Sequence, residues 1–280
     1  MERRIWASTA LVAPAFLILF LLFVLPFGLF FIISFWRTRL FEMEPAFTLD
    51  NYAAVGGYFD IVVFTVLIGL VIGLLVSALG FSLAYVIRFV AGQFGPPLLF
   101  ILLVTMFGGY LVKIYAWKTI LGSSGILMSV VQALGITDQR EHWFIYNPGA
   151  VVVALTHFLL PLATLPIYAA MRGIDIETIE AARDLGANRI RTVLTIILPQ
   201  CRQGLNVAVV FSFIVAAGDF VTPTFVGGPH AAMIGLFIHS QFAVRFNWPL
   251  GAAMAFTVLA AALLIIATVR FATDRLQPRW

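Results

Sequence analysis

Charge is scarce in this sequence. Only 11% of the 280 residues are Asp, Glu, Lys or Arg, whereas 62% are hydrophobic and the mean hydropathy is +1.03. A soluble domain is about one-quarter charged, and one soluble core could not bury this much Phe, Leu, Ile and Val. The shortage of charge therefore excludes a soluble globular protein. It predicts an integral membrane protein whose apolar surface faces lipid.

The residues that carry most enzyme chemistry are also few. Cys201 is the single cysteine, which excludes an intramolecular disulfide and a cysteine metal cluster. The four histidines are scattered, and we assign His142, His230 and His239 to the outer side. His157 lies within an apolar run, where we expect a hydrogen bond between helices. No glycine-rich loop ending in Lys and Ser or Thr is present. The sequence thus predicts no catalytic residue, no metal site and no cofactor in this chain.

Long apolar runs dominate what is present. About 20 apolar residues cross the hydrocarbon core of a bilayer, and six segments reach that length: 10–36, 61–88, 97–118, 148–171, 202–224 and 248–271. The first follows a basic start, but it is too long for a signal peptide, so we interpret it as a retained span. We expect an all-α integral membrane protein with six transmembrane helices, in which residues 1–280 form a single transmembrane domain.

Small residues recur on one face of the second apolar segment. Gly69, Gly73, Ser77 and Gly80 are spaced by three and four residues. Such a stripe lets two membrane helices approach closely. We therefore expect this face to pack against a neighbouring helix.

The basic residues predict the orientation. With a cytoplasmic N-terminus, most of the 17 Lys and Arg residues fall on the inner side: Arg3, Arg4, Arg88, Arg172, Arg183, Arg189, Arg191, Arg202, Arg270, Arg275 and Arg279. The outer loop 37–60 is net acidic. The positive-inside rule then favours cytoplasmic termini, and the net charge of +4 reflects this loop asymmetry rather than a nucleic-acid patch. In the outer segment 119–147, we expect one small helix at the surface around "ILMSVVQAL".

One polar segment, 172–200, interrupts the apolar pattern between the fourth and fifth spans. Its spacing predicts two short amphipathic helices, the first ending at Gly186 in a left-handed conformation. The second has one apolar stripe and is expected to end at Pro199. The stripe consists of Ile190, Val193, Leu194 and Ile197. The residues alone leave two alternatives open: a solvated loop packed on its own bundle, or a docking surface for a partner.

The same segment resembles the EAA motif of ABC-importer permeases. The matching residues are Glu180-Ala181-Ala182, Gly186, Ile196 and Leu198-Pro199, all at the spacing of the family. The resemblance implies the type I ABC importer permease fold. It also implies that the first short helix is the coupling helix, which docks on a cytoplasmic ATPase. The coupling residues it implies are Glu180, Ala181, Ala182, Asp184, Gly186 and Ala187.

Four further stretches are similar to spermidine/putrescine-type permeases, most of all to the first of their two permease subunits: "FTLDNYAAV", "IYAWKTILGSSGIL", "GDFVTPTFVGG" and "NWPLGAAMAF". One departure is Lys113-Ile114, where an Arg-Thr-like pair is expected. The resemblance implies a bacterial inner-membrane subunit that imports a small cation such as a polyamine. It also implies a cytoplasmic ATPase dimer that binds ATP and Mg, a second and different permease chain, and an external solute-binding protein.

A few polar residues near the spans are candidates for the solute pathway. Asp219 is the one acidic residue at the lip of a predicted span, where a carboxylate suits a cationic solute; alternatively it caps the end of that span. Tyr110, Tyr115 and Trp117 suit cation–π contacts with an amine, and they suit an aromatic belt at the membrane surface equally well. Lys113 lies among these aromatic residues.

Other functions stay open at this point. Importers of ferric iron, sulfate, opines or amino-acid-like solutes share the EAA motif. The motif therefore indicates the class of transporter and not the solute that it carries. An autonomous secondary transporter is expected to carry more intramembrane charge or inverted repeats. A membrane enzyme is expected to carry clustered His, Asp or Glu residues.

Overall fold

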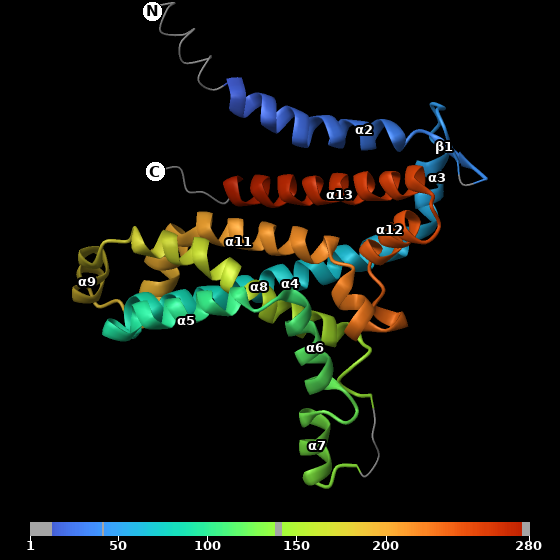
Figure 1. Ribbon diagram of the computed structural model, residues 1–280. Helices are drawn as coiled ribbons and strands as arrows, with labels where there is room; N and C mark the ends of the chain where they lie inside the picture. The colour runs from blue at the N-terminus through green and yellow to red at the C-terminus, as the bar shows by residue number, and fades with distance from the viewer. Residues whose placement is uncertain (1–12, 41, 138–141, 276–280) are drawn as a thin grey trace, which may run out of the picture. The chain divides into compact units, whose positions relative to one another are not determined.

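The computed structural model describes residues 13–40, 42–137 and 142–275, with 269–275 by backbone alone (Figure 1). Nearly all of the described chain is helical. By length and apolar composition, six of its helices are long enough to cross a membrane: Ala13–Ile33, Asp50–Val90, Tyr110–Ala133, Pro148–Arg172, Arg189–Gly218 and Trp248–Thr268. The prediction of an all-α protein with six spans is therefore confirmed, although some of the predicted bounds are wrong.

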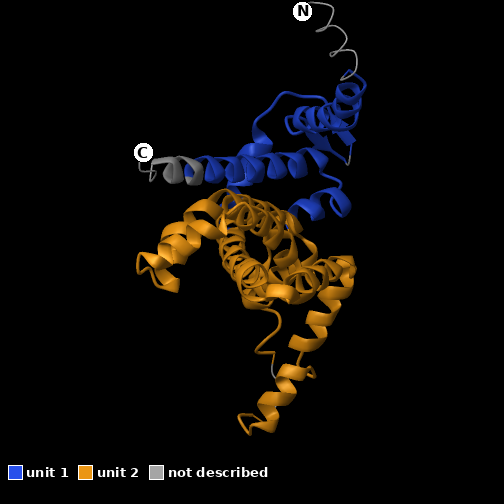
Figure 2. Ribbon diagram, turned by 90° about the vertical axis from the view of Figure 1, so that its left-hand side faces the viewer, with its two compact units in different colours: residues 1–60, 237–280 blue, residues 61–236 orange. Residues whose placement is uncertain are grey.

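The chain divides into two compact units (Figure 2). Unit 1 consists of residues 1–60 and 237–280, and unit 2 of residues 61–236. The described elements of unit 1 are η1 (Phe20–Val24), α2 (Leu25–Ile33), β1 (Arg37–Arg39), β2 (Glu42–Glu44), α3 (Asp50–Val55), η2 (Gly56–Tyr58), most of α12 (Ile234–Ala243) and α13 (Trp248–Arg275).

Aromatic side chains hold the helices of unit 1 together. The Phe256 ring on α13 lies 5.0 Å from both the Phe27 and the Phe31 ring on α2, each in an edge-to-face arrangement. Beyond α2, the Asn51 side-chain amide donates to the backbone oxygens of Ser34 and Trp36. These two hydrogen bonds fix α3 against the end of the first span.

A small hairpin in unit 1 was absent from the sequence-based prediction. Strands β1 and β2 pair antiparallel, with Arg37 opposite Glu44 and Arg39 opposite Glu42. Leu40 in the connection has a positive φ of 47°. Strands of three residues carry too little alternation to be read from the sequence, so only the pairing of the two segments reveals them.

Unit 2 contains the remaining helices. They are α4 (Phe59–Tyr85, from Ile61 onward), η3 (Val86–Val90), η4 (Gly92–Phe94), α5 (Gly95–Phe107), α6 (Tyr110–Leu121), α7 (Ile126–Ala133), α8 (Pro148–Arg172), α9 (Ile176–Asp184), α10 (Arg189–Thr192), η5 (Val193–Ile197), α11 (Leu198–Gly218), η6 (Pro223–Gly227) and η7 (Pro229–Ala231). Helix α7 confirms the small helix expected in the 119–147 segment. The candidate span Tyr110–Ala133 includes both α6 and α7, so the position of α7 at a membrane surface stays a prediction.

Glycines bring the central helices of unit 2 into close contact. A Cβ at Gly73 on α4 would lie 3.0 Å from the Val209 backbone oxygen on α11. A Cβ at Gly80 would lie 3.3 Å from the Thr164 hydroxyl on α8. The predicted packing role of the small-residue stripe is therefore confirmed. Gly204 also brings α11 close to α8, because a Cβ there would lie 2.6 Å from the Pro166 oxygen.

The predicted third span, 97–118, is wrong as a single helix. Helix α5 ends at Phe107, and Gly108 and Gly109 adopt extended conformations with ψ of 116° and 140° before α6 begins at Tyr110. Each glycine costs a helix roughly 1 kcal/mol relative to alanine, so a Gly-Gly pair is a favourable place for a break. Figure 1 shows α6 turning away from the direction of α5 at this point.

The prediction that Pro199 ends the second polar helix is also wrong. A wide π-turn, η5, ends at Ile197, two residues before the proline, and the Leu198 N–H donates to the Val193 oxygen five residues back. Pro199 then lies in the first turn of α11, where a missing N–H is tolerated. The chain therefore stays helical from Arg189 to Gly218, and the predicted fifth span, 202–224, begins earlier and ends earlier than expected.

Candidate functional site

Helix α9 presents two chemically different faces. Ile179 is only 5% exposed and packs into the core of unit 2, and Arg183, one turn later, lies on the same side. Glu177, Glu180 and Asp184 recur at spacings of three and four, and all three are exposed. The helix therefore turns an acidic face outward and an apolar and basic face toward its own bundle.

Gly186 ends this helix in the predicted way. Its φ is +84°, in the left-handed region, and the Ala187 N–H donates to the Ala182 oxygen while the Gly186 N–H donates to the Arg183 oxygen. This is the Schellman pattern of a helix end. A Cβ on Gly186 would meet no described atom within 4 Å, so the requirement for glycine comes from the backbone angle and not from crowding.

The other residues that the EAA resemblance singles out lie close together around this helix end. Ala181 is exposed, and Ala182 and Ala187 are half-buried. Leu185, just before the glycine, is 90% exposed. An apolar side chain in that position was not singled out from the sequence. It gives the outer surface of α9 a hydrophobic tip beside its acidic face.

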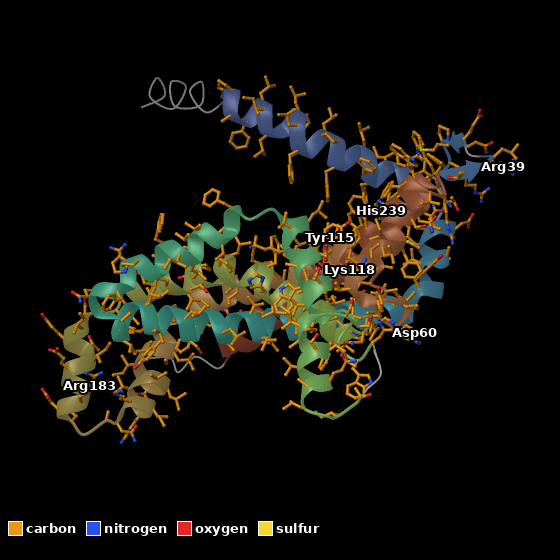
Figure 3. The ribbon with its side chains drawn as sticks, turned by 60° about the horizontal axis from the view of Figure 1, so that its bottom comes forward. Arg39, Asp60, Tyr115, Lys118, Arg183 and His239 are labelled. Carbon is orange, nitrogen blue, oxygen red and sulfur yellow. The ribbon has the colours of Figure 1, made fainter. Side chains whose placement is uncertain are left out.

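A cleft of about 480 Å³ lies on the other side of α9. It is lined by Tyr85, Phe89, Val90, Arg183, Arg189, Ile190, Val193 and Leu194, which come from the end of α4 with η3, from α9, and from α10 with η5. The predicted apolar stripe of the second polar helix thus faces this cleft for most of its length, while Ile197 is buried in the core. Figures 1 and 3 show α9, with Arg183, at one end of α5, α8 and α11.

Asp219 lies at the junction of two helices. Its backbone N–H donates to the Ala216 oxygen at the end of α11. One carboxylate oxygen accepts from the Val221 N–H and the other from the Thr222 N–H, both at 3.1 Å. Asp219 is 8% exposed. The side chain therefore caps the start of the helix that follows, whereas the sequence analysis had offered a cap at the end of the preceding span.

Tyr110, on the first turn of α6, reaches the same junction. Its hydroxyl lies 2.7 Å from the Thr222 hydroxyl, and its ring lies 4.5 Å from the Phe158 ring on α8. Lys113, one turn further along α6, places its ammonium 5.4 Å from the same Phe158 ring. Asp219, Tyr110 and Lys113 are therefore brought into one cluster, with Thr222 and Phe158 as members that the sequence analysis missed.

Tyr115 and Trp117 lie elsewhere on α6. The Tyr115 ring contacts Phe225 edge-on at 5.1 Å, and the Trp117 ring contacts His157 edge-on at 5.8 Å. Figure 3 shows Tyr115 on α6, next to Lys118. The ammonium of Lys118 also lies over the Phe225 ring, at 5.6 Å. The aromatic candidates thus do not form one cage, because a helix displays residues two apart on different sides.

Within the described residues, no group of three or more His, Cys, Asp and Glu side chains is placed to hold a metal ion.

Known proteins resemble this chain over most of its length. The spermidine/putrescine transport system permease protein PotB of Salmonella typhimurium is 31% identical over 228 residues, which cover 80% of this chain and 79% of the relative. The chain belongs to the family of spermidine/putrescine-type ABC transporter permeases. The inner membrane ABC transporter permease protein YdcU of Escherichia coli is 27% identical over 244 residues, covering 82% of this permease and 77% of the relative. PotC of Escherichia coli, a second spermidine/putrescine permease, is 30% identical over 118 residues, covering 42% and 45%.

Solved structures agree on the fold. A bacterial ABC transporter involved in the import of alginate matches this permease with a TM-score of 0.76 at 15% identity, over 99% of this chain and 98% of that one. The alginate transporter in complex with its periplasmic protein matches with a TM-score of 0.77 at 17% identity, over 98% and 96%. No family model matches the sequence.

The comparisons establish the class of protein. The chain is a multi-pass membrane permease subunit of an ABC transporter, and it is not itself an enzyme because ATP hydrolysis in such transporters resides in a separate subunit. The resemblance noted in the EAA motif is thereby confirmed at the level of the family and the fold. The roles of the individual residues stay predictions.

Proposed function

We propose that this permease forms half of a membrane pathway through which a polyamine such as spermidine or putrescine is imported. The observation that carries the proposal is the 31% identity to a spermidine/putrescine permease over 80% of the chain. The EAA motif, intact from Glu180 to Pro199, supports the import machinery.

In this proposal, α9 is the coupling helix within a cytoplasmic loop, 172–200. The exposed acidic face with Glu180 and Asp184 meets basic groups of the ATPase, and Ala181 and Ala182 let the two backbones approach. Gly186 and Ala187 set the direction in which the chain leaves the helix. The exposed Leu185 inserts at the tip of the contact. Full burial of this leucine, which is exposed in the permease alone, would contribute about 1.5–3 kcal/mol to docking.

The partners follow from the same proposal. A cytoplasmic ATPase dimer binds ATP and Mg, a second and different permease chain completes the pathway, and a periplasmic solute-binding protein delivers the cargo. The partial match to PotC supports a second, related chain. The match to an ABC transporter in complex with its periplasmic protein supports only the common fold. We place the permease in the bacterial inner membrane with both termini in the cytoplasm, as the basic residues favour.

The cluster around Asp219 and Tyr110 is proposed to line the pathway, together with Lys113, Tyr115 and Trp117. It lies where α5 and α11 end and the next helices begin. In secondary transporters, interrupted helices commonly surround the solute, and we extend this arrangement to the present permease. In our proposal, the Asp219 carboxylate is held in place by the backbone N–H groups of Val221 and Thr222. It is then an anionic group for the passing amine.

The decisive experiment is reconstituted transport. The permease is co-expressed with its proposed ATPase, second permease and binding protein, and the complex is placed in vesicles. Uptake of radiolabelled spermidine or putrescine, dependent on ATP and on the binding protein, is the expected result. ATP-dependent uptake of ferric iron, sulfate or an opine, with no uptake of polyamine, would overturn the proposed cargo. A permease that transports alone would overturn the mechanism.

A further inference from the structure

The cleft behind α9 has a lining of mixed character. Six of its eight lining residues are apolar or aromatic, and the other two are Arg183 and Arg189. Ile190 is 71% exposed and Leu194 is 57% exposed. Exposed aliphatic side chains are unfavourable in water, and guanidinium groups beside them attract an anion. Together they suit a ligand with an apolar part and an anionic part.

The two guanidinium groups are available for such a ligand. Among the described residues, neither Arg183 nor Arg189 forms an ion pair with an acidic side chain. A third guanidinium lies next to the cleft: Arg88 is positioned over the Phe89 ring at 5.5 Å, and its Nε is buried without a hydrogen-bond partner in the described structure. The local charge is therefore positive, although the acidic residues of α9 lie only a turn away on the opposite face.

The position of the cleft points to the membrane. One wall is the end of α4 and η3, which continue a long apolar span to Val90, and the other wall is the start of the span that runs from Arg189 to Gly218. The cleft thus lies at the ends of two candidate spans. Phosphate headgroups and the first part of the acyl chains surround the ends of spans in a bilayer.

We propose that this cleft binds an anionic phospholipid of the cytoplasmic leaflet. Its headgroup phosphate accepts hydrogen bonds from Arg183 and Arg189, and the upper part of an acyl chain lies along Tyr85, Ile190 and Leu194. The assignment to the cytoplasmic leaflet rests on the proposed function, which places α9 in the cytoplasm. The lipid occupies the inner side of α9 and leaves the acidic outer face free for the ATPase. It would link the coupling helix to the two spans beside it.

The test uses the purified transporter in a neutral detergent. Phosphatidylglycerol or phosphatidylcholine is titrated in, and native mass spectrometry counts the lipid molecules retained. We expect selective retention of phosphatidylglycerol. We also expect its apparent affinity to fall about fivefold for each arginine removed in Arg183→Gln and Arg189→Gln, singly and combined. The doubly substituted Arg183→Lys, Arg189→Lys protein, which keeps the charge, retains most of the binding.

Arg191→Gln is the matched control, because Arg191 is an exposed arginine of the same short helix that does not line the cleft. Equal loss of phosphatidylglycerol in this control would overturn the proposal, since the effect would then be diffuse charge. Unchanged retention in the double glutamine variant would overturn it as well.

The ATPase serves as an internal reporter in the same samples. Release of the ATPase from the double glutamine variant with lipid binding intact would assign the cleft to the ATPase and overturn the lipid proposal. An ATPase that fails to associate even with the unmodified permease would instead contradict the proposed function, and the lipid titration would remain readable on its own.

Discussion

The Tyr110 hydroxyl lies 2.7 Å from the Thr222 hydroxyl, and this hydrogen bond connects two helices that each begin just after a break. Tyr110 opens α6 after the Gly108-Gly109 interruption, and Thr222 precedes η6 after the end of α11 at Gly218. Two interruptions far apart in the sequence are thus held together by one pair of side chains.

We therefore expect Tyr110→Phe and Thr222→Val each to lower the free energy of unfolding by about 1 kcal/mol, the net value of one hydrogen bond. The double variant should lose little more than either single variant, because both remove the same bond. Unfolding of the purified permease in increasing dodecyl sulfate measures these values. Fully additive losses would show that the two hydroxyls do not act as a pair.

Substitution of Gly186 should impair transport but leave the permease folded. Its φ of +84° makes Gly186→Val strained by roughly 1–2 kcal/mol, and the strain falls on a short exposed helix end rather than on a span. We expect a folded permease whose uptake falls and whose ATPase loses stimulation by the loaded binding protein. Gly173→Ala is the control in the same loop, because Gly173 has an ordinary φ of −77°. Normal transport by Gly186→Val would refute the coupling role.

Two substitutions of Asp219 separate its helix-capping role from its proposed role in attracting the cationic solute. Asp219→Asn keeps an oxygen that can accept one of the two N–H groups but removes the charge, whereas Asp219→Ala removes the cap and should cost about 1 kcal/mol. If the charge attracts the cationic solute, Asp219→Asn lowers uptake well below that of the unmodified protein, although the permease loses less stability than it does in Asp219→Ala. Uptake by Asp219→Asn at the unmodified rate would leave capping as its role.

Gly204 offers a test of packing that is independent of the solute. A Cβ there would lie 2.6 Å from the Pro166 backbone oxygen, so Gly204→Ala should force α11 away from α8 and cost about 1–3 kcal/mol. Gly28→Ala, where no described atom lies within 4 Å, should be neutral or slightly stabilising because alanine favours helix. Equal thermal stability of the two variants in detergent would contradict the close approach.

Cysteine labelling can test the orientation of the permease in the membrane. With the buried Cys201 replaced by serine, a cysteine at Asn188 should react with a membrane-impermeant maleimide only from the cytoplasmic side. Asp138, the position expected on the outer side, lies outside the described residues. A cysteine there should react only from the periplasm. Reversed labelling would place α9, and the cleft behind it, on the wrong side of the membrane for both proposals.

The sequence alone determined the features that depend on local composition and spacing. Long apolar runs require lipid, so the six spans and the helical class were readable. The left-handed end of α9 at Gly186 was also readable, because glycine is the residue that adopts this conformation at little cost. The family resemblance depended on similarly local patterns, with Glu180, Gly186 and Pro199 at fixed spacing.

Tertiary structure decided what depends on contacts between distant segments. The wide π-turn shortly before Pro199 and the break at Gly108-Gly109 depend on which backbone groups find partners after the helices pack. Tyr110 and Thr222 are 112 residues apart, and no spacing rule connects them. The cleft behind α9 exists only because three separate segments meet around Arg183 and Arg189. Periodicity reports which face of a helix is apolar, but packing decides what that face contacts.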